Sequence, residues 1–67
     1  MNELLLTKEF YVEKYIQKGC NDFKGLADIS IITDEDYYRI RFNNCKYPAV
    51  ITIREFENYV IDLMVKR

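Results

Sequence analysis

Three consecutive carboxylates, Asp34, Glu35 and Asp36, come closest to a chemical site in this sequence. Oxygen ligands of this kind hold Ca²⁺ in EF-hand loops, but such a loop is longer and needs a glycine and a terminal glutamate. Paired carboxylates also act as general acid and base where a pocket perturbs them. Because these residues join two segments of alternating polarity, we expect an exposed, solvated hairpin turn rather than a metal or catalytic site.

Nucleophilic and zinc chemistry lack their usual residues in this sequence. It contains no histidine and only two cysteines, Cys20 and Cys45, which have no paired metal-ligand spacing. A zinc site needs more ligands, and a thiolate nucleophile needs a base. We expect Cys20 to belong to the core, Cys45 to be an incidental loop thiol, and both to stay unpaired in a reducing compartment. The sequence therefore predicts no enzymatic activity, no cofactor and no metal.

An aromatic side chain and two arginines form the third candidate. Tyr37, Arg39 and Arg41 alternate along one predicted strand, so they share its outward face. RRM-type domains stack bases on such a row, which makes nucleic-acid binding one hypothesis. Cross-strand pairing of the arginines with Asp28 is the plainer interpretation. The same face carries Ile32 and also fits a docking surface for a peptide or a protein.

Composition limits the class of protein. The 67 residues are 49% hydrophobic, which suffices for one small core and a single domain over 1–67. Ten basic and eleven acidic residues give a net charge of −1, without the basic excess typical of nucleic-acid binders. No apolar run approaches the length of a membrane span, and the first residues do not resemble a signal peptide. We therefore expect a cytoplasmic protein without a membrane partner.

Hydrophobic periodicity predicts the elements of the first half of the chain. Residues 3–10 predict a short strand with Leu4, Leu6 and Phe10 on one face. A helix is expected from residue 11 or 12 to residue 23. Its apolar stripe recurs at steps of three and four residues: Val12, Tyr15, Ile16, Cys20 and Phe23.

The second half predicts a hairpin and a final helix. Residues 27–33 and 37–43 alternate in polarity and predict two antiparallel strands. Because Pro48 disfavours helix in the residue before it, we expect extended chain through about residue 51. Thr52 followed by Glu55 matches a capping box and predicts a helix from residue 53 nearly to the basic end at 66–67.

The order strand, helix, strand, strand, helix predicts an α+β fold. The simplest packing is a three-stranded antiparallel sheet with both helices on one face. We expect the opposite face to carry mostly polar side chains: Asp28, Ser30, Ile32, Tyr37, Arg39 and Arg41.

Two segments carry a family resemblance. They are residues 10–23, which begin Phe-Tyr-Val-Glu-Lys, and residues 54–63, which contain Glu-Phe-x-Asn followed by an aspartate. With the hairpin between them, the chain resembles the small HxsD-like proteins that accompany radical S-adenosylmethionine enzymes in His-Xaa-Ser peptide-maturation systems. The resemblance implies a non-catalytic accessory protein that binds the precursor peptide or the enzyme. It also makes Asn58 and Asp62 candidate partner contacts.

The main functional hypothesis is thus a binding module, alone or as a homodimer, that docks a peptide or protein by its sheet face or edge. Its expected contacts are Ile32, Tyr37, Arg39 and Arg41 on the sheet, with Asn58 and Asp62 on the last helix. The alternative is a small nucleic-acid-binding domain that uses the Tyr37, Arg39 and Arg41 face. The sequence leaves open the partner, the pathway, the oligomeric state and whether residues 3–10 join the sheet.

Overall fold

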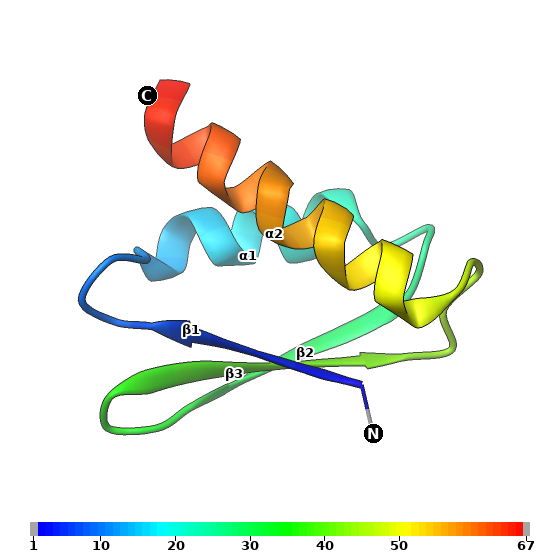
Figure 1. The fold of residues 1–67 in the computed structure, drawn as a ribbon, viewed down its shortest axis with the longest axis horizontal. Helices are drawn as coiled ribbons and strands as arrows, with labels where there is room; N and C mark the ends of the chain where they lie inside the picture. Colours follow the sequence, from blue (N-terminus) through cyan, green and yellow to red (C-terminus); the bar gives the residue numbers. More distant parts are fainter. Residues whose placement is uncertain (1, 67) are drawn as a thin grey trace.

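Five elements build the fold of residues 2–66, the part of the chain that the computed structural model describes. They are β1 (Glu3–Thr7), α1 (Glu13–Asp22), β2 (Asp28–Thr33), β3 (Tyr37–Asn43) and α2 (Ala49–Lys66). The strands form one antiparallel sheet in the order β1-β3-β2, so β3 is central and β1 and β2 are its edges. Figure 1 shows both helices on the same side of this sheet. The predicted α+β class and element order are confirmed, and the first strand joins the sheet.

The core lies between the sheet and the two helices. Alternate residues of the strands point inward, and each helix contributes the apolar side of its 3.6-residue period. The fully buried side chains come from β1, α1, β3 and α2: Leu6, Ile16, Ile40, Phe42, Phe56 and Val60. The Phe56 ring lies edge-on to the rings of Phe23 and Phe42, with centroids 5.4 and 5.3 Å away. This aromatic group ties α2 to both the end of α1 and the central strand.

The first strand is shorter than expected, and Phe10 does not reach the core. The chain turns after Thr7, whose carbonyl accepts hydrogen bonds from the N–H groups of Phe10 and Tyr11. The turn breaks the two-residue alternation, so Phe10 is 56% exposed and Tyr11 is buried in its place. The inward assignment of Leu6 holds, and that of Phe10 is wrong.

The hairpin of β2 and β3 is confirmed. Tyr38, Ile40 and Phe42 are buried, and the N–H of Asp34 donates to the carbonyl of Tyr37 at 2.8 Å across the turn. Within the described residues, the acidic side chains of the turn are not joined by other side chains that could bind a metal ion. Within residues 2–66 there is no cluster of side chains able to hold a metal ion.

The capping box proposed at Thr52 is wrong, because α2 begins earlier, at Ala49. Pro48 accepts hydrogen bonds from the N–H groups of Ile51 and Thr52 at its carbonyl. Proline restricts the residue before it, but its own fixed φ suits the first turn of a helix. Thr52 lies inside the helix and is 4% exposed. Of the predicted basic end, Lys66 closes α2, and Arg67 lies outside the described residues.

Candidate functional site

The outer face of the sheet brings together the four sheet residues expected to contact a partner. The strand register places Leu5, Arg39 and Ile32 in one row across β1, β3 and β2. Tyr37 stands on the same side of β3, two residues from Arg39, and Arg41 follows two residues later. Leu5, Ile32 and Tyr37 are exposed. Leu5 was not among the expected contacts, because the sequence leaves open whether residues 3–10 join the sheet.

Both arginines on this face already have carboxylate partners. Arg41 Nε donates to Glu3 Oε2 at 2.8 Å, and Arg39 Nη2 donates to Asp34 Oδ2 at the same distance. Arg39 Nη1 also lies 3.7 Å from Glu3 Oε1. The hydrogen bond and the charge of Asp34, followed by the charge of Glu3, raise the pKa of Arg39 above its ordinary value. The guanidinium groups are thus engaged by neighbours in the folded chain.

The expected pairing of these arginines with Asp28 is wrong. Asp28 lies opposite Asn43 at the far end of the hairpin, and its carboxylate accepts a hydrogen bond from Asn44 Nδ2 at 2.7 Å. The carboxylate beside Arg41 comes instead from Glu3 on β1. Only the pairing of β1 with β3, which joins residues far apart in sequence, brings this acid to the face.

Asn58 and Asp62 do not join the outer-face residues. Both lie exposed on α2, in the helix layer, which covers the other side of the sheet (Figure 1). One partner would have to wrap around the domain to contact both sets. The structure therefore separates the candidate contacts into two surfaces.

The free edge of β2 has backbone groups directed away from the sheet. In an antiparallel pair, residues alternate between exchanging hydrogen bonds with the partner strand and pointing their N–H and C=O groups outward. The bond from Asp34 to Tyr37 sets this alternation, so the outward groups belong to Ile29, Ile31 and Thr33. Within residues 2–66, no strand pairs with β2 on this side.

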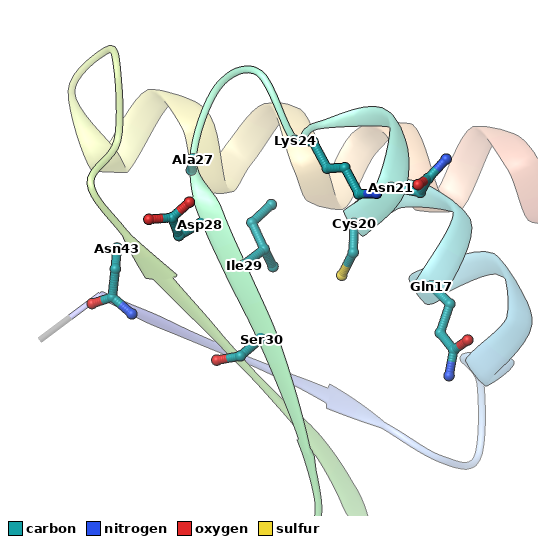
Figure 2. Close-up of a pocket in the computed structure, with 9 residues that line it drawn as sticks. All are labelled: Gln17, Cys20, Asn21, Lys24, Ala27, Asp28, Ile29, Ser30 and Asn43. Atoms are coloured by element: carbon teal, nitrogen blue, oxygen red, sulfur yellow. The ribbon is translucent and has the colours of Figure 1, made fainter.

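A groove of about 440 Å³ runs between this edge and α1. Its volume lies within the range of about 300–1,000 Å³ common for ligand sites. Figure 2 shows side chains projecting from α1 on one side of β2 and polar side chains on the other side of the strand. The lining residues come from α1, the segment after it and the strands: Gln17, Cys20, Asn21, Lys24, Ala27, Asp28, Ile29, Ser30 and Asn43.

Cys20 contributes an apolar wall to the groove rather than a nucleophile. Burial raises the pKa of its thiol to about 11, so the thiol is protonated at neutral pH. Ile29, on the facing wall, is partly buried and packs against the core. The groove thus has apolar surface from Cys20 and Ile29 beneath a polar rim, which is a common composition for binding sites.

The edge of β1 is less open than that of β2. The Thr7 carbonyl, which points to this edge, is occupied by two N–H groups of the following turn. Glu3 on β1 is held by both arginines of β3. Edge strands are commonly protected by short length, charge, proline or bulges. β2, with the sequence Asp-Ile-Ser-Ile-Ile-Thr, has a charge only at its first residue. The isoleucine-rich composition of β2 was visible in the sequence, but its position at an edge of the sheet and the groove beside it were not.

No family model, characterised protein or solved structure matches this chain. Across residues 2–66, neither helix is long and apolar enough to cross a membrane.

Proposed function

We propose that this protein is a peptide-binding module that takes an extended segment as an additional strand along β2. The observation that carries the proposal is the uncovered edge of β2 beside an open groove under α1. Several peptide-recognition domains bind in this way: main-chain hydrogen bonds to a strand edge supply affinity, and adjacent pockets select alternate side chains.

The geometry defines how such a segment would sit. Its backbone would exchange hydrogen bonds with Ile29, Ile31 and Thr33, whose N–H and C=O groups point outward. Every second side chain would enter the groove and contact Cys20 and Ile29. The remaining side chains would lie over the outer face, where Ile32 is the exposed apolar residue nearest the edge.

The family resemblance supports a peptide as the occupant. An accessory protein of radical S-adenosylmethionine peptide maturation would hold an unfolded precursor, and extended peptides are the segments that pair with strand edges. Such a protein would act in the cytoplasm, where free thiols such as Cys20 and Cys45 persist. It would need no cofactor of its own.

Proline substitution at Ile31 tests the proposal, because the Ile31 N–H points to the free edge and not to β3. We expect Ile31→Pro to abolish binding of fluorescein-labelled peptides selected from a phage-displayed library of random dodecapeptides. Ile31→Ala is the matched control, since it loses similar packing but keeps the N–H, and it should retain binding. Circular dichroism should show that both variants are folded. Equal affinities of the two variants would contradict strand addition at this edge.

A second copy of the chain is the competing occupant of the edge. Strand β2 of one molecule pairing with β2 of another would extend the sheet across a homodimer. Sedimentation of the wild-type protein and of Ile31→Pro distinguishes the two cases. We expect both proteins to be monomers without peptide. A wild-type dimer that is lost in Ile31→Pro would show that the occupant of the edge is a second copy of the chain and not a peptide.

Nucleic-acid binding remains the alternative from the sequence, but the structure offers it less support. Phosphate-driven binding needs free cationic groups, whereas Arg39 and Arg41 are engaged by carboxylates. We expect no shift in the fluorescence anisotropy of a labelled single-stranded RNA at low salt. Binding that falls steeply as salt is added, and that is lost in Arg39→Ala with Arg41→Ala, would reinstate the alternative.

A further inference from the structure

The groove beside β2 is lined by one cation and one anion, which lie on opposite sides of the strand. Lys24 follows α1 and stands on the helix side, whereas Asp28 lies on the outer side of β2 (Figure 2). The other lining residues are uncharged. A segment added to this edge would therefore meet a positive charge on one face and a negative charge on the other.

Neither charge is neutralised within the described chain. Asp22, the acid nearest to Lys24 in sequence, is engaged by Lys18 at 3.3 Å and by the hydroxyl of Tyr59. No ion pair in residues 2–66 includes Lys24 or Asp28. Asp28 accepts a hydrogen bond from the neutral amide of Asn44, which orients the carboxylate without cancelling its charge. Both groups are thus available to an opposite charge on a ligand.

Successive side chains of a strand point to opposite faces of its sheet. Two neighbouring residues of the bound segment would therefore face Lys24 and Asp28 in turn. We propose that the ligand is a peptide with an acidic residue directed to Lys24 and, adjacent to it, a basic residue directed to Asp28. This inference rests on the proposed function, since it concerns the side chains of a segment that is already paired with β2.

Opposite charges that lie close together attract, and like charges repel. Reversing one of the two charges replaces an attraction by a repulsion, and we expect it to weaken binding about tenfold at low salt. Added salt should reduce this factor, because the groove is open to solvent. Exchanging both charges should restore binding only to peptides in which the acidic and basic residues are also exchanged.

The test is selection from a phage-displayed library of random dodecapeptides on four proteins and one control variant. These are the wild type, Lys24→Glu, Asp28→Lys and the double variant with both changes. Lys66→Glu, at the end of α2, is the control for net charge. Selected peptides are then synthesised with fluorescein and titrated by anisotropy against each protein and against Ile31→Pro.

We expect wild-type selections to be enriched in neighbouring acidic and basic residues, and the double variant to select the reverse order. Lys66→Glu should select the same peptides as the wild type. Selected peptides that need the Ile31 N–H but show no charge preference would overturn the charge pairing and leave strand addition intact. Failure of the wild type to retain any peptide would overturn the proposed function itself.

Discussion

Replacing Gly19 with alanine measures how closely the helix pair is packed. Gly19 is buried where α1 faces α2. A Cβ at this position would lie 3.1 Å from Phe56 Cε1 and 3.1 Å from Val60 Cγ2. Both of these side chains are fully buried, so neighbouring atoms restrict their movement away from the new methyl group.

Two opposing effects determine how much Gly19→Ala changes the free energy of unfolding. Alanine is favoured over glycine inside a helix by about 1 kcal/mol. Overpacking a well-filled core costs about 1–3 kcal/mol. Because the methyl group would press on two fully buried side chains that have little room to move, we expect Gly19→Ala to lower the free energy of unfolding by about 1 kcal/mol net. In a domain of this size, such a loss lowers the melting temperature by about 4–8 °C.

Gly25→Ala is the matched control. A Cβ there meets nothing within 4 Å, and no glycine of residues 2–66 has a positive φ. This variant should be as stable as the wild type or more stable by up to about 1 kcal/mol, because alanine restricts the unfolded chain. Urea and thermal unfolding followed by far-ultraviolet circular dichroism measure both variants.

A second substitution tests whether overpacking is the cause. Val60→Ala removes one of the two crowding side chains, so it should cost less in the Gly19→Ala background than in the wild type. A Gly19→Ala variant that is about 1 kcal/mol more stable than the wild type would refute the reasoning, because the helix-propensity gain would then meet no steric opposition.

Three further substitutions test other parts of the structure. Phe56→Ala should cost about 3–5 kcal/mol and leave the chain largely unfolded by circular dichroism, since a domain this small has a similar total stability. Burial raises the pKa of the Cys20 thiol from its ordinary 9.0 to about 11. The contribution of the buried, protonated thiol to the free energy of unfolding is therefore complete below pH 9 and is lost as pH rises towards 11. The stability difference between wild type and Cys20→Ala should therefore shrink over that window, and a constant difference would contradict the burial. The hydroxyl of Tyr59 donates a hydrogen bond to Asp22 and, as the main cause, lowers the pKa of that carboxyl below its ordinary 3.8. Tyr59→Phe should raise the Asp22 pKa in a ¹³C NMR titration, and any stability lost in this variant should be seen above pH 3.8 and vanish in more acidic solution.

Local sequence patterns were sufficient to predict the hairpin of β2 and β3. Tyr38, Ile40 and Phe42 alternate with polar residues, and this two-residue period assigns each side chain to a face without knowledge of the rest of the fold. The helical stripe of α1 was predictable for the same reason. Local signals failed at Thr52, where the capping-box pattern predicted a later helix start than the one at Ala49, directly after Pro48.

The candidate site depended on contacts between distant residues. The pairing of β1 with β3 places Glu3 beside Arg41, although 38 positions separate them in sequence. That contact engages an arginine that the sequence presents as a candidate partner contact. Similarly, Lys24 and Asp28 are close in sequence, but their places on opposite sides of one strand edge follow from the position of α1 over the sheet.

The sequence by itself therefore determined the element types, the faces of the hairpin and the α+β class, because side-chain periodicity is a property of consecutive residues. The tertiary structure alone decided which strands are edges, which charges neutralise one another and where a groove remains open. These features depend on strand order and helix placement, which are set by packing among residues far apart in the chain. The uncovered β2 edge, on which the proposed function rests, is a result of that packing.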